Sequence, residues 1–266
     1  GNVCNKAEVH SALEGATFVF HAASYGMSGR DQLNKELIEQ VNVQGTHNIL
    51  EACYTHSIPY LVYTSTYNVV FGHNEIRDGN ESLPYLPMDQ HTDHYSRTKS
   101  IAEQIVLSFN KTKLKDGNIL KTTAIRPADI YGEDEQWHLP RIVSYIERGL
   151  FAFTYGSKDN MVDFVHVDNL VLSHVLAGLA LTEMSSKAAG QAYFISDGKP
   201  TNNFEFFRPL VSSTSFLTEL IHSVVGRYIY NFQPILTRTE VHNTGVTHYF
   251  SINKAKNEIG YNPCYI

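Results

Sequence analysis

The chain has 266 residues, of which 42% are hydrophobic and 18% charged, and its formal net charge is −6. This length and hydrophobic content suit one large α/β domain or a domain with a small appendage. The acidic balance, without a run of Lys and Arg, excludes a typical nucleic-acid-binding protein. The three cysteines form no C-x-x-C pair, which argues against a disulfide framework or a zinc site and suits a reducing compartment.

In chain order, the pattern of apolar residues predicts helices that alternate with short strands. The expected strands cover 17–21, 60–63, 120–125, 162–167 and 192–196, and the expected helices cover 6–13, 36–56, 94–109, 139–149 and 168–183. Residues 71–93 are rich in Gly, Asn, Asp and Pro and are expected to form a long loop. Pro127 is expected to stop the third strand, and Asp168 to cap the last helix. This alternation predicts a parallel sheet with helices on both faces.

The longest apolar stretch covers residues 216–232 and contains Glu219, His222 and Arg227. These charges argue against a free-standing membrane span, which needs about 20 mostly apolar residues. An amphipathic helix on a membrane surface and a helix packed on the domain's own core both fit the pattern.

The strongest chemical signal is the run Tyr95-Ser96-Arg97-Thr98-Lys99. Positions i and i+4 share one face of a helix, so the phenol and the ammonium are expected to point into one cleft. A free tyrosine has a pKa of about 10 and exchanges protons poorly at neutral pH. A neighbouring ammonium lowers that pKa, which would suit Tyr95 to general acid/base catalysis. Because a lone Y-x-x-x-K arises often by chance, the hypothesis needs support from other segments.

Three further segments support it. The hydroxyl cluster Thr64-Ser65-Thr66 follows an apolar strand, at the end where α/β sheets place their ligand crevice, although a turn-forming cluster is the simpler alternative. The run Asn42-Val43-Gln44-Gly45-Thr46 places a glycine inside a predicted helix, at a cost of about 1 kcal/mol relative to alanine, which indicates close packing there. The run 126–132 follows the next strand and is expected at the same edge of the sheet.

These segments, together with His21-Ala22-Ala23, resemble the extended short-chain dehydrogenases/reductases, and more narrowly the 3β-hydroxysteroid dehydrogenase/isomerase type. Stretches 23–30, 81–87 and 204–207 resemble its 42E branch. The resemblance implies an α/β fold with a Rossmann-like, doubly wound parallel sheet. Residues 1–132 would form a partial dinucleotide-binding region with the catalytic motifs. Residues 133–266 would complete the sheet and form a small C-terminal α/β substrate lobe.

The resemblance also implies a role for each matching residue. Tyr95 would be the proton donor and acceptor, and Lys99 would lower its pKa and bind the nicotinamide ribose. Thr66 would be the catalytic hydroxyl, and Asn42 would shape the active-site helix and support a proton relay. The cofactor, NAD or NADP, would contact Val3, Ala22, Ala23, Ser65, Lys99, Pro127 and Ile130. The substrate would contact Tyr25, Met27 and Tyr131.

The sequence departs from this family at its start, where the family has a strand, a Gly-rich turn and a helix that hold the pyrophosphate. We therefore expect a sheet that lacks its first βαβ unit, in a fragment that folds and binds cofactor poorly alone. Asn2 replaces an Asp expected near adenine, and Glu133 stands where proline is common. Gly26 and Gly29 lack the third glycine of a phosphate loop and are expected in a substrate-side loop.

The implied reaction is NAD(P)-dependent oxidation of a CH–OH group, or reduction of the ketone, on a small apolar, steroid-like substrate, as in steroid biosynthesis. A coupled isomerisation, contact with a membrane surface and a homodimer are left open, and no nucleic-acid partner is expected. We expect the chain to face the cytoplasm, with association with the endoplasmic reticulum membrane left open.

Three alternatives remain. A nucleotide-sugar epimerase or dehydratase would use the same Tyr–Lys pair, but would need Arg or Lys for a pyrophosphate in the C-terminal part, which is mildly acidic and rich in aromatic residues. A non-catalytic, dinucleotide-sensing scaffold could share the fold. A metal enzyme is disfavoured, because His91 and His94 lack accompanying acidic or cysteine ligands. His166 is expected to be a core histidine.

Overall fold

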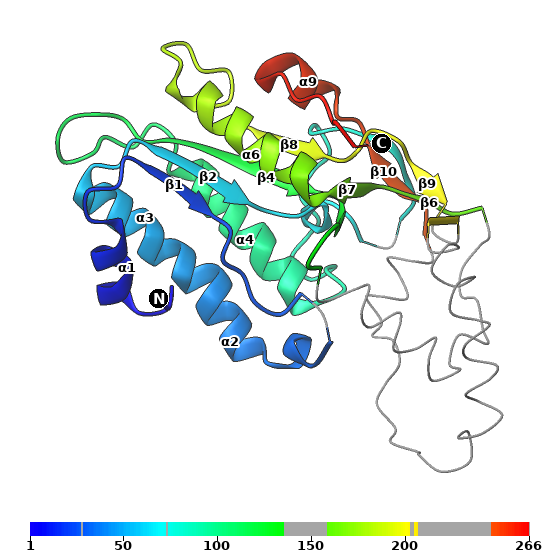
Figure 1. Ribbon diagram of the computed structural model, residues 1–266. Helices are drawn as coiled ribbons and strands as arrows, with labels where there is room; N and C mark the ends of the chain where they lie inside the picture. The colour runs from blue at the N-terminus through cyan, green and yellow to red at the C-terminus, as the bar shows by residue number, and fades with distance from the viewer. Residues whose placement is uncertain (28, 73, 136–158, 203–204, 207–245, 266) are drawn as a thin grey trace.

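A four-stranded parallel sheet forms the centre of the protein. The computed structural model describes residues 1–27, 29–72, 74–135, 159–202, 205–206 and 246–265 (Figure 1). The strands are β1 (Phe18–His21), β2 (Tyr60–Thr64), β4 (Lys121–Pro127) and β8 (Ala192–Ile195), hydrogen-bonded in the order β1-β2-β4-β8. All three pairings are parallel. The predicted α/β fold with a parallel sheet is confirmed.

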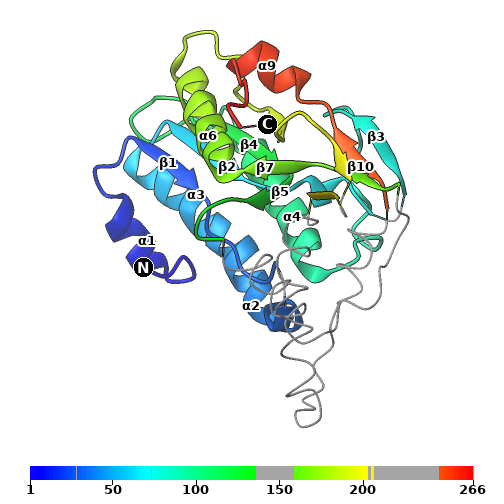
Figure 2. The ribbon, with the colours of Figure 1, turned by 45° about the vertical axis from the view of Figure 1, so that its right-hand side comes forward.

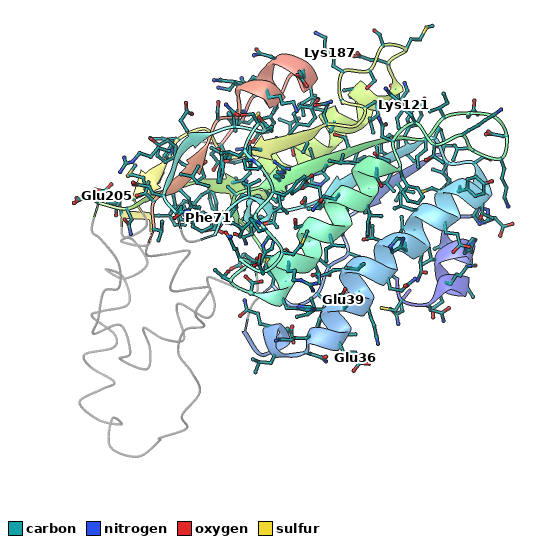
Figure 3. The ribbon with its side chains drawn as sticks, turned by 180° about the vertical axis from the view of Figure 1, so that it is seen from behind. Glu36, Glu39, Phe71, Lys121, Lys187 and Glu205 are labelled. Carbon is teal, nitrogen blue, oxygen red and sulfur yellow. The ribbon has the colours of Figure 1, made fainter. Side chains whose placement is uncertain are left out.

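Helices cover both faces of this sheet, as Figure 1 and the turned view in Figure 2 show. On one face lie α1 (Lys6–Leu13), α3 (Gly45–His56) and α4 (His94–Ser108), and on the other α6 (Val167–Thr182) and α9 (Asn253–Ile259). Seen from behind, α3 and α4 lie side by side (Figure 3). Each face buries its own apolar cluster, so the sheet is doubly wound.

The start of α4 is fixed by its N-cap, Asp93. The carboxylate accepts a hydrogen bond from the backbone N–H of Ser96 at 2.7 Å and from the Ser96 hydroxyl at 2.8 Å. This cap satisfies a backbone donor that the first turn of the helix cannot use internally. It therefore sets the position of Tyr95 in the first turn, at the end of the helix that faces the carboxyl edge of the sheet.

The predicted helix 36–56 is not uniform. It consists of α2 (Lys35–Glu39), a π turn over Gln40–Gln44 that contains Asn42, and α3. A π turn inserts an extra residue into the helical repeat and is frequent at functional sites. A Cβ atom at Gly45 would lie 2.8 Å from Cγ2 of Val3, so the close packing expected at this glycine is present.

Short strands beside the main sheet account for most differences from the predicted elements. A second sheet has the order β3-β10-β6-β9, and β5 pairs with β7. The strands are β3 (Ile76–Gly79), β5 (Asp129–Tyr131), β6 (Met161–Val162), β7 (Phe164–His166), β9 (Thr201–Asn202) and β10 (His248–Phe250). The expected loop 71–93 thus contains a strand, and the expected strand 162–167 is divided at Asp163.

β4 ends at Pro127, as expected, two residues beyond the predicted bound of 125, and Pro127 still pairs with Ile195. One local prediction is wrong. The N-cap of α6 is His166 and not Asp168: the imidazole accepts the backbone N–H of Asp168 at 3.2 Å. The expected helices in 139–149 and 216–232 lie outside the described residues, and the domain division at 133 stays a prediction. No helix among the described residues is long and apolar enough to cross a bilayer.

Candidate active site

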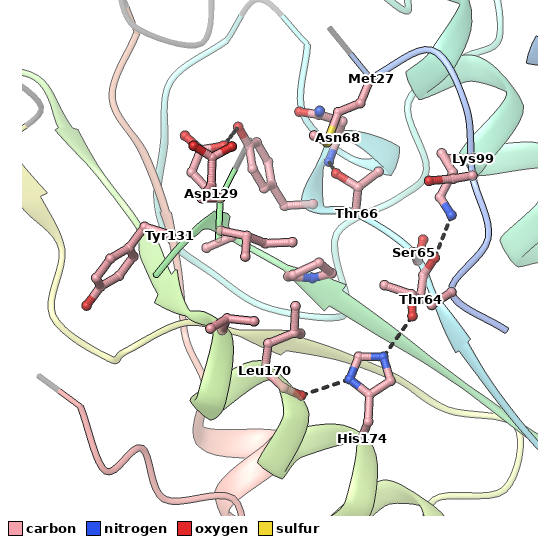
Figure 4. A pocket seen from close by; sticks show the side chains of 18 of the residues that line it. Met27, Thr64, Ser65, Thr66, Asn68, Lys99, Asp129, Tyr131, Leu170 and His174 are labelled. Atoms are coloured by element: carbon pink, nitrogen blue, oxygen red, sulfur yellow. Dashed lines mark hydrogen bonds between the residues drawn. The ribbon is translucent and has the colours of Figure 1, made fainter. Parts of the chain in front are cut away.

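A cavity of about 710 Å³ lies where β1, β2 and β4 end (Figure 4). Ala22 follows β1, the cluster 64–66 closes β2, and Pro127 ends β4, and all of them line the cavity. Parallel α/β sheets place ligand sites at this carboxyl edge, because loops there bring residues from several strands together. The sheet therefore explains why segments far apart in sequence meet in one cavity.

Helix α4 supplies the side chains of Tyr95 and Lys99, which both line the cavity and are 6% and 2% exposed. Nζ of Lys99 donates to the carbonyl oxygen of Thr64 at 2.5 Å and lies 4.2 Å from the ring centroid of Tyr63. Glu103, one turn further along the same face of α4, is fully buried. The helix thus presents a phenol, an ammonium and a carboxylate in one row along the sheet.

Burial has the largest effect on the pKa values of Tyr95 and Lys99. It raises the pKa of Tyr95, a hydrogen bond with Ser24 lowers that pKa, and the Asp93 carboxylate raises it. Burial also lowers the pKa of Lys99 to about 7, although the Glu103 carboxylate raises it. Lys99 is not among the groups that shift the pKa of Tyr95 in this geometry, and its predicted effect on that pKa stays a prediction. The ammonium is bound to the Thr64 carbonyl, and the loss of water around the phenol outweighs the other effects.

Asn42 lies behind the cavity and is buried. Its Oδ1 accepts the backbone N–H of Tyr25 at 2.9 Å, and its Nδ2 donates to the Tyr25 carbonyl and to Oγ1 of Thr98, each at 3.0 Å. The amide therefore fastens the segment after β1 to α4. Because Ser24 precedes Tyr25 in that segment, this clamp also holds Ser24 beside the phenol of Tyr95.

His174 on α6 joins the site through Thr64. Its Nδ1 lies 2.8 Å from the Leu170 carbonyl, and its Nε2 lies 2.8 Å from Oγ1 of Thr64 (Figure 4). A carbonyl only accepts, so Nδ1 carries the proton and the Thr64 hydroxyl donates to Nε2. Burial lowers the pKa of His174, which favours this neutral form. Sequence reasoning missed this residue, because nothing in the helical pattern of 168–183 marks it.

The structure brings most of the predicted site residues together. The cavity is lined by Ala22, Met27, Ser65, Thr66, Tyr95, Lys99, Pro127, Ile130 and Tyr131. Val3, Ala23 and Tyr25 do not line it: Val3 packs against Gly45, and the hydroxyl of Tyr25 donates to Asp31 at 2.8 Å. Their predicted ligand contacts stay predictions. Among the described residues, no three His, Cys, Asp or Glu side chains are grouped to hold a metal ion.

A doubly wound parallel sheet with a buried Tyr–Lys pair on a helix at its carboxyl edge defines the short-chain dehydrogenase/reductase class. A sequence profile of the 3-beta hydroxysteroid dehydrogenase/isomerase family matches residues 1–220. The chain belongs to this family, as predicted.

Its relatives agree with that assignment. Short-chain dehydrogenase/reductase family 42E member 1 of Danio rerio is 62% identical over 97% of this chain and 71% of its own length. The Homo sapiens protein of the same name is 58% identical over 98% and 72%. A 3beta-hydroxysteroid-dehydrogenase/decarboxylase of Arabidopsis thaliana is 36% identical over 97% and 61%.

Solved structures with low sequence identity share the fold. A dTDP-glucose 4,6-dehydratase from Streptomyces venezuelae with NAD bound has a TM-score of 0.69 at 21% identity, covering all of this chain and 74% of its own. A UDP-glucose 4-epimerase from Thermotoga maritima has a TM-score of 0.68 at 18% identity, covering all of this chain and 79% of its own. These similarities establish the fold and leave the substrate open.

Proposed function

We propose that the protein is an NAD(P)-dependent oxidoreductase that interconverts a hydroxyl group and a ketone on an apolar, steroid-like substrate. The observation that carries the proposal is the convergence of Tyr95, Lys99 and Thr66 on one largely apolar cavity. The family assignment supports the reaction class, and the name of the Arabidopsis relative supports a hydroxysteroid substrate.

The residues present fit the nicotinamide half of the cofactor. Ser65 lines the cavity, and its Oγ is buried without a hydrogen-bond partner among the described residues, so a ligand hydroxyl group would satisfy it. Lys99 lines the same wall, and Pro127 and Ile130 offer an apolar surface to a planar ring. When bound, the cofactor supplies or accepts the hydride. The dehydratase and epimerase folds that this chain resembles are also found with NAD, which supports the same cofactor class here.

Each catalytic side chain has a role that follows from its surroundings. The raised pKa keeps the phenol of Tyr95 protonated at neutral pH, so it can donate a proton to the oxygen of a ketone that is being reduced. The hydroxyl of Thr66 can hold that oxygen. Lys99 places a cation beside the ribose site, and Asn42 holds the wall that contains Ser24. Met27 and Tyr131 provide surface for the substrate.

The charge on the cavity wall favours an apolar substrate over a nucleotide sugar. Among the described lining residues, Lys99 is the only Lys or Arg, and its ammonium is already bound to the Thr64 carbonyl. A diphosphate would need Arg or Lys that could turn toward it. A nucleotide-sugar epimerase or dehydratase is the second candidate function, because the solved structures with a similar fold are proteins of those two kinds.

The test uses the protein in its natural full length, with absorbance of the reduced nicotinamide as the readout. We expect turnover of a steroid alcohol and none of UDP-glucose. Replacing Tyr95→Phe removes the proton donor, so kcat should fall by about 10²- to 10⁴-fold while cofactor binding is kept. The matched control is Tyr54→Phe, at an exposed tyrosine on α3, which should leave kcat unchanged. Wild-type kcat in Tyr95→Phe would contradict the proposal.

Contact with a membrane surface, a homodimer and a location facing the cytoplasm stay predictions. The amphipathic segment 216–232, on which the membrane contact depends, lies outside the described residues. Flotation of the natural full-length protein with lipid vesicles would test that contact.

A further inference from the structure

Asp129 places a carboxylate in the cavity at a position to which the family motif assigns no role. It is the first residue of β5, two residues after Pro127 at the end of β4, and it lines the cavity. Its Oδ1 accepts a hydrogen bond from the phenol of Tyr67 at 3.2 Å (Figure 4). Its Oδ2 has no hydrogen-bond partner in the described part of the chain and is available to a ligand.

The phenol that holds Asp129 is itself firmly packed. Tyr67 is buried and follows Thr66, whose hydroxyl accepts the backbone N–H of Asn68 at 3.3 Å. The ring of Tyr67 contacts those of Phe71 and His248, with centroids 5.9 and 5.0 Å apart. The same short turn therefore carries the proposed catalytic hydroxyl of Thr66 and the group that orients the carboxylate. The two polar groups are held in a fixed relation to each other.

The carboxylate lies away from the cation of the site. Figure 4 shows Asp129 and Lys99 on opposite sides of Thr66, and the Lys99 ammonium is bound to the Thr64 carbonyl. Asp93, another acid of the wall, is occupied as the cap of α4. The cavity wall also carries apolar side chains, among them Ile130 and Leu170. The cavity thus offers a proton donor, apolar surface, and a carboxylate acceptor that lies away from Lys99.

We infer that Asp129 binds a hydroxyl group of the substrate that is remote from the reacting carbon, so the substrate class is a neutral, apolar diol. This inference rests on the proposed function. Hydrogen bonds to a charged acceptor are roughly twice as strong as neutral ones, so the contact discriminates strongly between ligands. The same charge repels a substrate that carries a carboxylate or a phosphate at that end.

The test compares a steroid monoalcohol with the same steroid carrying a second hydroxyl group at the far end of its ring system. Wild-type protein should have a higher kcat/KM for the diol than for the monoalcohol. In Asp129→Leu this preference should fall about tenfold, because KM for the diol rises while kcat and KM for the monoalcohol change little. The matched control is Asp134→Asn, which removes an equal charge from the same wall. Asp134 has a φ of 62°, which asparagine tolerates, so the control should keep the wild-type preference.

Calorimetric titration of the two steroids separates this inference from the proposed function, because binding does not require turnover. Tighter binding of the diol that is lost in Asp129→Leu supports the inference even where neither steroid is oxidised. Equal affinity of wild type for both steroids overturns it, even where both are oxidised. Tighter binding of a steroid amine than of the diol also overturns the assignment to a neutral hydroxyl. Should Asp129→Leu fail to fold, the nearly isosteric Asp129→Asn is measured in its place, with a smaller loss of preference expected.

Discussion

At the level of single residues, the protonation of Lys99 differs strongly from that of a lysine side chain in water. Lys99 is 2% exposed, and this burial is offset in part by one carbonyl oxygen, one aromatic face and the nearby Glu103 carboxylate. Charged groups lose several kcal/mol of hydration when they are buried, and a lysine responds by releasing its proton more easily. The pKa of Lys99 is lowered from 10.5 to about 7 for this reason.

This shift predicts a pH-dependent stability. Below pH 7 the ammonium is charged in both the folded and the unfolded chain, and the full cost of burying it is present. Between pH 7 and 10.5 the unfolded chain keeps a proton that the folded chain has released, so the free energy of unfolding rises with pH. We expect urea denaturation to show the wild type gaining stability relative to Lys99→Met across this interval. A difference that stays constant with pH would refute the lowered pKa.

At the scale of elements, α4 is held against β4 by a buried ion pair. Nη2 of Arg126 lies 2.6 Å from Oε1 of Glu103, with side chains 4% and 0% exposed, and the phenol of Tyr85 donates to the same oxygen at 2.7 Å. Tyr95 and Lys99 lie two turns and one turn earlier on that face of the helix. The pair therefore fixes the helix that carries the proposed catalytic groups.

Replacing Glu103→Gln should lower the free energy of unfolding by about 3 kcal/mol, because it leaves the buried Arg126 charge without a counter-ion. Chemical denaturation measures the change. The control is Glu75→Gln, which breaks a pair with Arg77 of the same 2.6 Å length on the surface, and should leave stability unchanged. Equal effects of the two substitutions would mean that burial does not decide the strength of the pair.

Some of the helices and strands could be predicted from the sequence, and others could not. Helices α1 and α4 and the four central strands carry their own apolar periodicity and caps, so local pattern locates them within about two residues. The Tyr–Lys run, the hydroxyl cluster and the segment after β4 could be placed at one edge, because parallel strands end there. Strands β6, β9 and β10 have two or three residues and pair with distant segments, so no local pattern marks them. Asp129 and His174 become visible only through contacts across the sheet.

At the scale of the whole molecule, one side of the cavity continues into an apolar surface. In the described residues β1 is an edge strand, paired with β2 alone, and Phe20 on it is 51% exposed. Val171 and Val175 on α6 line the cavity and are also exposed, and Leu179 extends the surface along the helix. Edge strands with exposed apolar side chains favour association with other chains.

The glycines near the cavity predict how tightly the chain of 266 residues binds its cofactor. Tight binding of a dinucleotide usually needs the backbone N–H groups of a Gly-rich turn at a helix N-terminus, which hold the pyrophosphate. The glycine pair after β1, Gly26 and Gly29, leads into a short 3-10 helix over Gly29–Leu33, and that turn has no third glycine. The described residues therefore offer contacts to the nicotinamide half of the cofactor and no cradle for its phosphates.

We expect calorimetry on the 266-residue chain to show the same weak affinity for NADH and for reduced nicotinamide mononucleotide. Each Kd should be about 1 mM, which corresponds to a binding free energy of about −4 kcal/mol. The adenosine half of NADH should add nothing, because the described part of the chain has no turn that binds its phosphates. Lys99→Met should weaken both ligands alike, since both carry the ribose that the ammonium would contact. Micromolar binding of NADH together with millimolar binding of the mononucleotide would contradict the prediction, because only a second, phosphate-binding contact in this chain could separate the two ligands.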